Sequence, residues 1–474
     1  MRVLLMTVPA PWEQDQHRFM NTRRKGFGWL KIRPLVNVVP SPSLLYLVPY
    51  LREDGHEVHY LEGLFSTPET VLDEVARIRP DMIGMTVTSV DWRNAKALAR
   101  SLRGAFPDAT LVVGGIHPTL WKEQCFEECR ELDVVVYGDG EITTRLLAHR
   151  LSAGDTLEGL EGTIFRKDGE VVTNPPRPPV EDLDTLPFPD RSVVDLTRYL
   201  PSPTFYHRLP HESIIGSRGC PFQCTFCHTD PHTRMRSARN IVDEIEMLHR
   251  DHGVVDVAFW DDTFTLSERR ATEVCDEILR RNLKVDWCVN ARADKVSLPL
   301  LRHMKRAGCW RVLYGIESGV QKNIDTLKKG LTLEQIADAV AMTSTAGIEA
   351  YGTFMFGIPG ETYEEGLKTI EFACSIGLDF AVFVSLTPFP GSAVYDDVKA
   401  GRIRAVKHEA PYDLKNVSFV PEGLTEEQIT TLIKTAHKRF YLRPRQVGRR
   451  IRKMRNIHDL KKNIKGFFLL LTSS

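Results

Sequence analysis

The chain has 474 residues, with 62 Lys and Arg against 62 Asp and Glu, so its formal net charge is zero. That balance excludes the general excess of positive charge on which non-specific nucleic-acid binders depend. Hydrophobic residues make up 42% and charged residues 26%, as in globular proteins, and the length predicts roughly two or three domains. The nine cysteines contain a single close triplet, which is not a disulfide framework and indicates a reducing cytosol.

The amino terminus, residues 1–12, has one basic residue and an apolar run too short for a signal peptide. We interpret this segment as a first strand. Apolar runs elsewhere fall short of the roughly 18 residues that span a bilayer. These features predict a cytoplasmic protein.

Short apolar segments alternate with helical patterns through residues 1–160, which we interpret as a first domain. The expected strands are 2–7, 57–61, 82–86, 110–113 and 133–137. The expected helices are 44–52, 68–78, 92–102 and 143–151. This alternation predicts a Rossmann-like, doubly wound parallel α/β sheet, whose ligands bind outside the carboxyl ends of the strands.

Hydroxyl and glycine residues follow the third, fourth and fifth of these strands. Hydroxyls can hydrogen-bond a polar ligand, and glycines let a ligand approach the backbone closely. One such turn alone is as consistent with a plain turn, but three at one sheet edge indicate a binding site. The candidates are Thr86, Thr88, Ser89, Gly114, Gly115, His117, Tyr137, Gly138, Gly140 and Glu141.

Together these turns resemble the cobalamin-binding domain found before the catalytic domain in one large enzyme subfamily. The resemblance implies that the ten candidates contact cobalamin. The Asp-x-His-x-x-Gly motif, which supplies a histidine to cobalt in other cobalamin-binding proteins, is missing, and 15–17 is only a distant approach to it. The resemblance therefore implies cobalamin without a histidine on its lower face, and we interpret His117 as a polar loop residue.

Residues 161–210 are interpreted as a linker. A small hairpin is expected at 162–173, with its turn at 167–169. The proline-rich stretch 174–179 forbids both helix and central strand. We expect an extended connector between two domains, without catalytic residues.

Cys220, Cys224 and Cys227 follow in the spacing Cys-x3-Cys-x2-Cys. An iron–sulfur cubane normally takes four thiolates, so three would leave one iron open to a small molecule. Cys224 to His228 also matches the c-type haem attachment pattern, which needs an exported chain. The three thiols with His228 could instead hold zinc, or they could be core thiols, although the neighbouring glycine and proline disfavour a buried strand.

The triplet, with Phe226 before its last cysteine, resembles the signature of the radical S-adenosylmethionine superfamily. The resemblance implies that Cys220, Cys224 and Cys227 hold a [4Fe–4S] cluster whose open iron binds S-adenosylmethionine. Reductive cleavage then gives a 5′-deoxyadenosyl radical. A flavodoxin- or ferredoxin-type protein is expected as the reductant.

Residues 211–400 repeat a strand and a helix about every thirty residues and form the expected second domain. The expected strands are 213–215, 254–260, 285–290, 311–314, 350–356 and 380–385. The expected helices include 241–249, 271–281, 333–343 and 363–374. The pattern predicts a partial (β/α)6 barrel of the TIM type, with function at the carboxyl ends of its strands.

Polar and glycine-rich motifs follow these strands. Paired carboxylates can bind a metal or an ammonium group or cap a helix, and an arginine can bind a carboxylate or form a surface ion pair. In the resembled superfamily the matching positions contact S-adenosylmethionine. The implied contacts are Phe226, Asp261, Asp262, Thr263, Arg292, Glu317, Ser318, Gly357, Pro359, Gly360, Thr387 and Pro388.

The last region, residues 401–474, combines a helix expected at 425–440 with a basic segment that runs to residue 465. Thr425 and Gln428 form a capping-box pattern at the start of the helix. Basic and apolar residues alternate after it, which suits an anionic membrane surface as well as a helical cap over the barrel. No recognisable module supports RNA binding.

Nearly the whole chain thus resembles the cobalamin-dependent radical S-adenosylmethionine enzymes. The resemblance implies C-methylation of an unactivated carbon of a small molecule, and the basic tail favours an isoprenoid or other lipid. Cyclisation, ring rearrangement and carbon–carbon coupling are alternatives within the enzymes. A non-catalytic cobalamin- or cluster-binding regulator is the alternative of another class.

Overall fold

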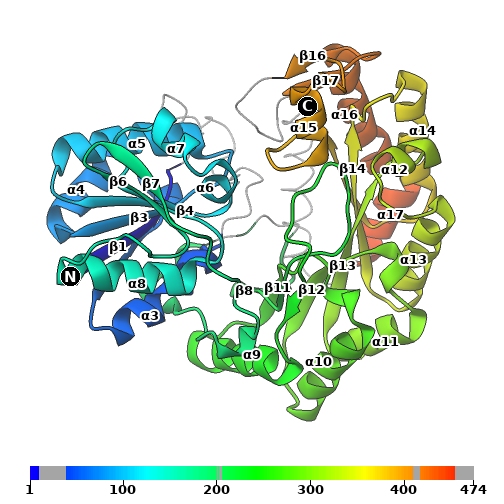
Figure 1. The fold of residues 1–474 in the computed structure, drawn as a ribbon. Helices are drawn as coiled ribbons and strands as arrows, with labels where there is room; N and C mark the ends of the chain where they lie inside the picture. The colour runs from blue at the N-terminus through cyan, green and yellow to red at the C-terminus, as the bar shows by residue number, and fades with distance from the viewer. Residues whose placement is uncertain (10–38, 200, 202–204, 409–416, 454–474) are drawn as a thin grey trace, which may run out of the picture. The chain divides into compact units, whose positions relative to one another are not determined.

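The computed structural model describes residues 1–9, 39–199, 201, 205–408 and 417–453. The chain forms two compact units, Met1–Leu200 and Pro201–Ser474. Figure 1 shows an α/β arrangement in each of them. Residues 15–17, which only approach the missing Asp-x-His-x-x-Gly motif, and the tail beyond residue 453 lie outside the described residues.

The first unit is built on a seven-stranded sheet of order β2-β1-β3-β4-β5-β6-β7. Its strands are β1 (Arg2–Thr7), β2 (Glu57–Leu61), β3 (Met82–Thr86), β4 (Thr110–Gly114), β5 (Val134–Val136), β6 (Thr163–Lys167) and β7 (Glu170–Thr173). Strands β1 to β5 pair in parallel, as the sequence predicted. The strand order reverses between β1 and β3, which is where such sheets bind ligands.

Apolar side chains on successive residues of these strands enter two separate cores. Leu4 packs with residues of α4 and α5, whereas Leu5 packs with residues of α3 and α8. The helices are α2 (Pro42–Leu45), α3 (Leu47–Glu53), α4 (Pro68–Ile78), α5 (Trp92–Ala105), α6 (Ile116–Trp121), α7 (Gln124–Glu128) and α8 (Gly140–Ala153). A sheet covered on both faces is the predicted doubly wound architecture.

The hairpin β6–β7, expected at the start of a linker, belongs to the sheet of the first unit. Strand β6 pairs antiparallel with β5, opposing Ile164 to Val135. Ile164 and Phe165 are buried in the two cores. The sequence predicted a linker here, and the structure shows part of the sheet. The reason is that burying two apolar side chains in the cores stabilises the hairpin against the first unit.

The second unit holds a six-stranded parallel sheet of order β15-β14-β13-β12-β11-β8. Its strands are β8 (His211–Ile214), β11 (Asp256–Phe259), β12 (Asp286–Ala291), β13 (Cys309–Glu317), β14 (Glu349–Phe356) and β15 (Phe380–Ser385). Its helices are α9 (Ala238–His252), α10 (Glu268–Arg280), α11 (Leu298–Arg306), α12 (Gln321–Thr326), α13 (Leu333–Thr345), α14 (Tyr363–Ser375) and α15 (Ala393–Lys399). Strands β8 and β15 are the two edge strands of this sheet and do not pair with each other, so the barrel is not closed. The sheet is therefore the partial barrel that the sequence predicted.

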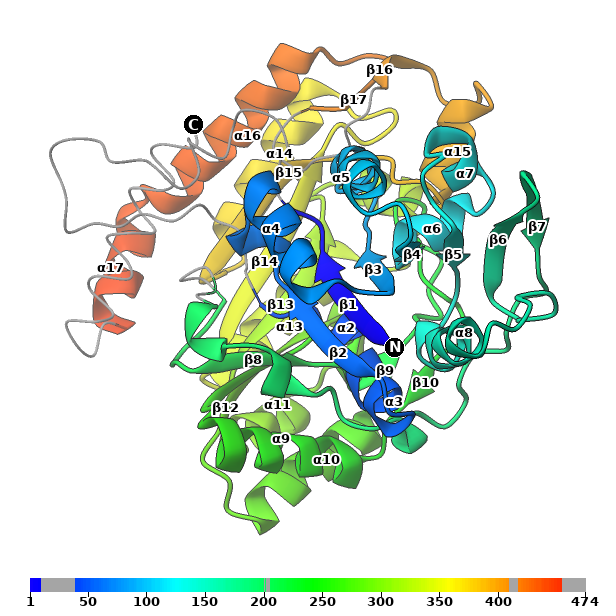
Figure 2. The same ribbon diagram turned by 90° about the vertical axis from the view of Figure 1, so that its left-hand side faces the viewer.

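Two further helices follow a small antiparallel ribbon. The elements are β16 (Ala405–His408), β17 (Phe419–Pro421), α16 (Glu426–Tyr441) and α17 (Pro444–Lys453). Thr425 and Gln428 form the expected capping box. Figure 2 shows α16 and α17 following one another along the outside of the barrel. Among the described residues, no helix is both long and apolar enough to cross a membrane.

Helices α14 and α16 approach closely at Gly366. A Cβ atom at this position would lie 2.5 Å from Leu432 Cδ1. We expect Gly366→Ala to destabilise the fold by about 1–3 kcal/mol through overpacking. Gly104→Ala is the matched control, since Gly104 lies in α5 with no atom within 4 Å of its added Cβ, and it should stabilise by about 0.5–1 kcal/mol. Urea unfolding measures both changes, and equal effects would contradict the close packing.

Candidate functional site

The cysteine loop leaves the carboxyl end of β8 and is closed by a short ribbon. Strand β9 (Ser217–Arg218) pairs antiparallel with β10 (Arg234–Met235). Gly219 opens the loop with φ +85°, and a Cβ there would lie 2.4 Å from the carbonyl oxygen of His232. Only glycine fits this position, which brings the chain into the loop.

All three loop cysteines carry free thiols. Cys220 and Cys224 are half-buried, and Cys227 is more exposed. The Cys220 amide donates to the carbonyl of Asp230 and the Cys227 amide to that of Cys224, so the backbone holds the turn that groups them. His228 Nδ1 lies 3.0 Å from the carbonyl oxygen of Gly391.

The thiols are surrounded by charges of both signs. Desolvation and then the Asp262 carboxylate raise the pKa of Cys227 to about 11. Desolvation also raises the pKa of Cys224, opposed by the positive charges of Lys329 and Arg292. Without a metal these two thiols are therefore protonated at neutral pH. Metal binding would release the protons, and the two cations would stabilise the resulting thiolates.

The described residues contain no group of three or more His, Cys, Asp or Glu side chains gathered tightly enough for one metal ion. A single zinc ion needs every ligand sulfur at about 2.3 Å. A cubane instead takes each thiolate on a separate iron. Three free thiols on one loop, beside two cations, are a donor set that fits such a cluster.

The segment Leu327–Lys329, which follows α12, holds the cysteine loop in place. The Thr225 amide donates to the carbonyl of Leu327 at 3.0 Å. The Lys329 ammonium lies 5.6 Å from the centre of the Phe226 ring. Arg292 Nη2 donates to the carbonyl of Lys329 at 2.8 Å. The loop is thereby tied to α12 and to the end of β12.

Arg292 also contacts the loop directly. Its guanidinium lies 3.5 Å from the centre of the Phe222 ring, and its Nε donates to Asp294 at 3.0 Å. Stacking on an aromatic ring and pairing with a carboxylate are typical of arginine. The structure therefore occupies most of the guanidinium of Arg292 with protein contacts.

Glu317 forms a buried ion pair with Lys329. The Lys329 Nζ lies 2.9 Å from Glu317 Oε1, and each side chain is only 7% exposed. Glu317 has φ +70°, and its carboxylate folds back over Gly315, where a Cβ would lie 2.4 Å from Oε1. Lys329 is a site residue that the sequence did not indicate, because it lies twelve positions after its partner and in no motif.

Asp261 is fully buried at the end of β11 and is occupied by protein partners. Its oxygens accept from the Gly216 amide at 2.6 Å, from Ser217 Oγ at 2.7 Å and from Arg270 Nη2 at 2.7 Å. Asp261 was expected to contact a ligand. In the structure its carboxylate fixes the chain that enters the cysteine loop, because all three of these donors come from the protein.

Asp262 differs from its neighbour because its side chain reaches solvent. Desolvation and then the adjacent Asp261 charge raise the pKa of Asp262. The Asp262 charge is one of the causes of the raised pKa of Cys227. Thr263, which follows, is buried and precedes a short 3₁₀ turn.

Ser318 is likewise buried and bound within the protein. Its Oγ lies 3.0 Å from Thr369 Oγ1 and 3.2 Å from Asn323 Nδ2. Asn323 also donates to Glu361, whose other oxygen accepts from the Gly357 amide at 2.7 Å. These bonds join the ends of β13 and β14. Ser318, like Asp261, therefore holds the backbone around the site in place.

Glycines and hydroxyls line the ends of β14 and β15. Gly357 and Gly360 have φ +84° and +79°, with half-buried Pro359 between them. Thr387 and Pro388 are buried after β15. The Thr387 hydroxyl has no hydrogen-bond partner within the described chain. A buried hydroxyl of this kind is satisfied by a bound ligand or water.

In the first unit, the expected residues lie along one edge of the sheet. The strand register pairs Thr7 with Thr86 and Thr86 with Gly114, so these three residues lie side by side. Gly115 follows with φ +102°, and its Cβ would lie 2.9 Å from the carbonyl oxygen of Val87. Thr88 Oγ1 donates to Asp91 at 2.6 Å. The ends of β1, β3 and β4 thus meet at the point where the strand order reverses.

His117 is buried between two indole rings. The ring centroids of Trp92 and Trp121 lie 4.5 Å and 5.7 Å from that of His117. Its Nδ1 lies 3.2 Å from Ser89 Oγ. Burial lowers the pKa of His117 to about 4, so the imidazole is neutral at physiological pH. The interpretation of His117 as a loop residue is wrong, because His117 lies in the first turn of α6, where the two indole rings bury it.

The end of β5 joins the hairpin to the same edge. Tyr137 is buried, and its hydroxyl donates to the carbonyl of Asn174 at 2.6 Å. The Gly138 amide donates to Thr119 Oγ1 at 3.1 Å. The remaining candidates, Gly140 and Glu141, begin α8. The Tyr137 hydroxyl therefore anchors the hairpin and is already bound.

A buried carboxylate at this edge was not expected from the sequence. Glu62 accepts hydrogen bonds from Thr7 Oγ1, from Tyr60 Oη at 2.9 Å and from Tyr199 Oη at 3.2 Å. It connects the ends of β1 and β2 to the last residues of the first unit. A glutamate directly after a strand carries no sequence signal that separates it from a surface residue.

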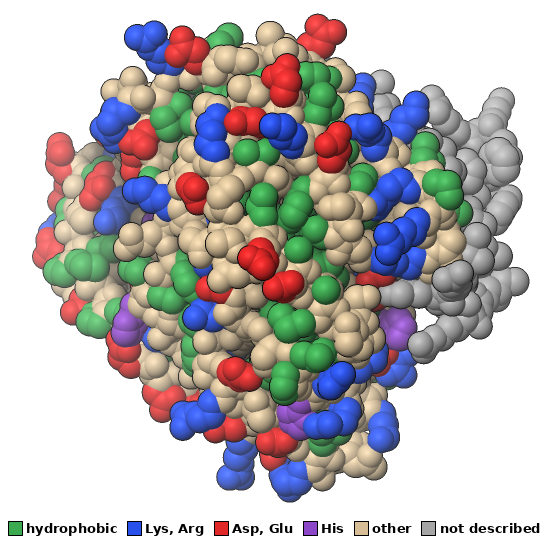
Figure 3. Space-filling view, turned by 90° about the vertical axis from the view of Figure 1, so that its right-hand side faces the viewer, with side chains coloured by type: hydrophobic (Ala, Val, Ile, Leu, Met, Phe, Trp, Pro, Cys, Tyr) green, Lys and Arg blue, Asp and Glu red, His purple; other side chains and the backbone are tan. Residues whose placement is uncertain are grey.

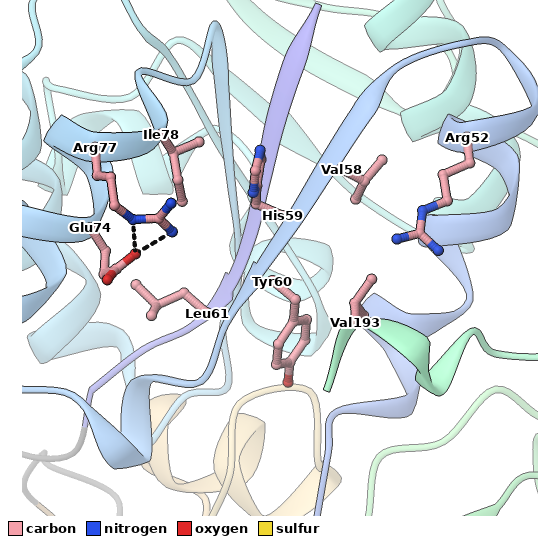
Figure 4. Close-up of a pocket in the computed structure, with 9 residues that line it drawn as sticks. All are labelled: Arg52, Val58, His59, Tyr60, Leu61, Glu74, Arg77, Ile78 and Val193. Atoms are coloured by element: carbon pink, nitrogen blue, oxygen red, sulfur yellow. Dashed lines mark hydrogen bonds and ion pairs between the residues drawn. The ribbon is translucent and has the colours of Figure 1, made fainter. Parts of the chain in front are cut away.

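A cavity of about 260 Å³ lies elsewhere, beside the edge strand β2, as Figure 4 shows. Arg77 on its wall is paired with Glu74 at 2.7 Å. Its lining contains none of the predicted site residues. The lining is formed by Arg52, Val58, His59, Tyr60, Leu61, Glu74, Arg77, Ile78 and Val193.

Comparisons with known proteins agree with the two units. A B12-binding domain model matches residues 32–148, and a radical SAM superfamily model matches residues 214–373. An uncharacterized methyltransferase of Pyrococcus horikoshii is 31% identical over 86% of this chain and 88% of its own length. The anaerobic magnesium-protoporphyrin IX monomethyl ester cyclase of Rubrivivax gelatinosus is 27% identical over 85% of this chain and 74% of its own.

Among solved structures, the radical S-adenosylmethionine methyltransferase TsrM of Kitasatospora setae has a similar fold. It superposes with a TM-score of 0.70 and 21% identity, over 92% of this chain and 90% of its own. That structure holds tryptophan and an S-adenosylmethionine analogue. The similarity extends through both units and shows a shared fold.

Replacing Lys329 with methionine should leave the Glu317 charge buried and unpaired. We expect Lys329→Met to lower the free energy of unfolding by about 3–5 kcal/mol. Lys328→Met is the matched control, because Lys328 is exposed, and it should change stability little. Adding Glu317→Met to Lys329→Met should restore much of the loss in urea unfolding. Additive losses would show that the two side chains do not interact.

Glu361 should make stability depend on pH. Desolvation raises its pKa from 4.5 to about 7, so the native state holds this proton more tightly than the unfolded chain. The stability contributed by the protonated carboxyl is complete below pH 4.5 and is lost as the pH rises through 7, a change on the order of 3 kcal/mol. Glu361→Gln, which keeps an acceptor, should flatten this slope in unfolding measured from pH 5 to 8. An unchanged slope would contradict the assignment.

Proposed function

Because this chain belongs to the cobalamin-dependent radical S-adenosylmethionine enzymes, we propose that it methylates an unactivated carbon of a small molecule. The family uses a [4Fe–4S] cluster, S-adenosylmethionine and cobalamin. When bound, these cofactors supply an electron, a 5′-deoxyadenosyl radical for hydrogen abstraction, and the methyl group. The free cysteine triplet beside Lys329 and Arg292 is the observation that carries the proposal.

Cys220, Cys224 and Cys227 hold the cluster in this proposal, and Phe226 and Lys329 cover one side of their loop. Three ligands leave an open coordination position for the amine and carboxylate of S-adenosylmethionine. The nearby cations favour the thiolate form of the ligands. No residue is assigned as an acid or base.

The nucleoside pocket is proposed at the carboxyl ends of β11 to β15. The residues proposed to contact S-adenosylmethionine are Asp262, Thr263, Arg292, Glu317, Gly357, Pro359, Gly360, Thr387 and Pro388. The unpartnered Thr387 hydroxyl and the exposed Asp262 carboxylate support this assignment. Asp261 and Ser318 position the backbone behind these contacts, since their own polar atoms are occupied.

Cobalamin is proposed to lie along the sheet edge of the first unit. Gly114, Gly115 and Gly138 allow close approach of a large ligand to the backbone. Thr86 and Thr88 present hydroxyls beside them, and Gly140 and Glu141 start the helix that follows. His117 and Tyr137 shape this edge from buried positions and supply no ligand to cobalt.

The names of the relatives support methylation and leave one competitor. Four relatives are named methyltransferases: one of Pyrococcus horikoshii, one of Streptomyces wedmorensis and two of Chlorobaculum tepidum. Three others are cyclases of magnesium-protoporphyrin IX monomethyl ester. A non-methylating cyclisation is therefore the second candidate function, since both chemistries need the same radical.

The proposal extends to a reductant, a substrate class and a location. A flavodoxin- or ferredoxin-type protein supplies the electron. The substrate is an isoprenoid or another lipid, and the protein contacts the membrane surface peripherally through its carboxyl-terminal helices. The basic and apolar composition of α16 and α17 supports this part of the proposal.

Turnover with methyl-deuterated S-adenosylmethionine separates the two functions. The protein is purified without oxygen, reconstituted with iron, sulfide and cobalamin, and reduced. We expect both 5′-deoxyadenosine and S-adenosylhomocysteine by mass spectrometry, with Cys220→Ala as the inactive control. 5′-Deoxyadenosine alone would favour cyclisation, and neither product in the parent enzyme would contradict the radical function.

A further inference from the structure

A groove of about 610 Å³ lies on the second unit between α14 and the junction of α16 with α17. Buried Ile370 and partly buried Cys374 line it from α14, together with the exposed Glu371 and Ser375, and Leu442, which is 44% exposed, lines it from the junction. Basic side chains form the other wall. They are Lys438, Arg439, Arg443 and Arg445. A partly apolar floor that carries one carboxylate thus meets a wall of four cations.

The four positive charges of this wall are offset only in part by the part of the chain that the structure describes, because Glu371 is the one acidic side chain among the described residues that line the groove. None of the four basic side chains forms an ion pair with a described residue. Arg443 donates only to the backbone carbonyls of Cys374 and Phe440. Burial, together with the charges of Arg449 and Arg445, lowers the pKa of Arg443. Such a group is stabilised by an anion.

The excess continues along the chain. Residues 434–453 contain nine Lys and Arg and no Asp or Glu. Val447 in α17 is a second exposed apolar side chain, 43% exposed, five residues after Leu442. Figure 3, which views the side of the molecule that carries α14, shows Lys and Arg side chains at several places on this face, with hydrophobic side chains among them. This surface is amphipathic as well as positive.

The groove lies at the opposite end of the barrel from the cysteine loop. Ile429, in the first turn of α16, approaches Gly357 beyond the carboxyl end of β14. Tyr441, at the end of α16, hydrogen-bonds to Ala381 near the amino end of β15. The helix therefore runs away from the catalytic edge. A ligand here serves neither as substrate at the cluster nor as its direct electron donor.

We propose that this groove, together with the exposed Leu442 and Val447, docks on an anionic phospholipid surface. Phosphate headgroups match the unpaired cations, and exposed apolar side chains can enter the boundary of the acyl chains. An acidic protein would match the charge but would leave the exposure of the apolar side chains Leu442 and Val447 unexplained. The inference deepens the membrane contact proposed above and rests on that contact, not on the radical chemistry.

Flotation of the full-length protein with phosphatidylcholine vesicles, with and without phosphatidylglycerol, tests the proposal. We expect binding only to the anionic vesicles at about 0.1 M salt and its loss at about 0.5 M salt. The triple variant Lys438→Glu, Arg439→Glu, Arg445→Glu should lower the partition coefficient by at least about 100-fold. The matched control reverses three exposed cations away from the groove: Lys284→Glu, Arg302→Glu and Lys305→Glu.

A second variant tests the apolar part. Leu442→Gln with Val447→Gln should weaken binding about tenfold or more while leaving its salt dependence unchanged. Unchanged thermal unfolding and iron content show that each variant is folded. Equal binding by the groove and control triples would overturn the groove as the site while leaving membrane contact in place. If the parent protein does not bind anionic vesicles, both the groove as a lipid site and the membrane contact are overturned, and an acidic protein is favoured as the occupant of the groove.

None of these outcomes bears on formation of 5′-deoxyadenosine, which is measured without vesicles.

Discussion

The buried ion pair between Glu317 and Lys329 is the constraint on which the rest of the site depends. It forms at the end of β13 at a distance of 2.9 Å and requires a glycine at position 315. Lys329 belongs to the short segment that binds the Thr225 amide and accepts from Arg292. The position of the cysteine loop is thus set by groups outside it, so that a loop rich in glycine and proline can still present three thiols in a fixed arrangement.

The polar residues around the cysteine loop divide into two groups. Asp261 and Ser318 are buried, and their hydrogen-bonding capacity is spent on the protein. Asp262 and Thr387 keep a carboxylate or hydroxyl without such partners among the described residues. Buried polar groups need partners to be tolerated, so the first group fixes the backbone, and the second group is the one that we propose to contact ligands. The first unit shows the same two groups. His117 and Tyr137 are buried and contact other protein groups, whereas the glycines leave the backbone accessible to a ligand.

The sequence predicted the parallel strands well because continuous apolar runs between helices have few other interpretations, and β1 and β15 match residue for residue. The cysteine triplet was equally clear. Neighbouring Asp261 and Asp262 could not be told apart, because their difference arises from Arg270, which lies nine residues later. Lys329 and Glu62 gave no signal, since ion pairs between distant positions leave no local pattern. The hairpin was misplaced because its pairing with β5 is a tertiary contact.

We propose that three cysteines hold a cluster with one open iron. Electron paramagnetic resonance of the reconstituted, reduced protein, recorded with and without S-adenosylmethionine, can test this. We expect a [4Fe–4S] signal that changes when S-adenosylmethionine is added, and no such signal once Cys220, Cys224 and Cys227 are all replaced by alanine. A signal indifferent to S-adenosylmethionine, or one that survives the triple replacement, would contradict it.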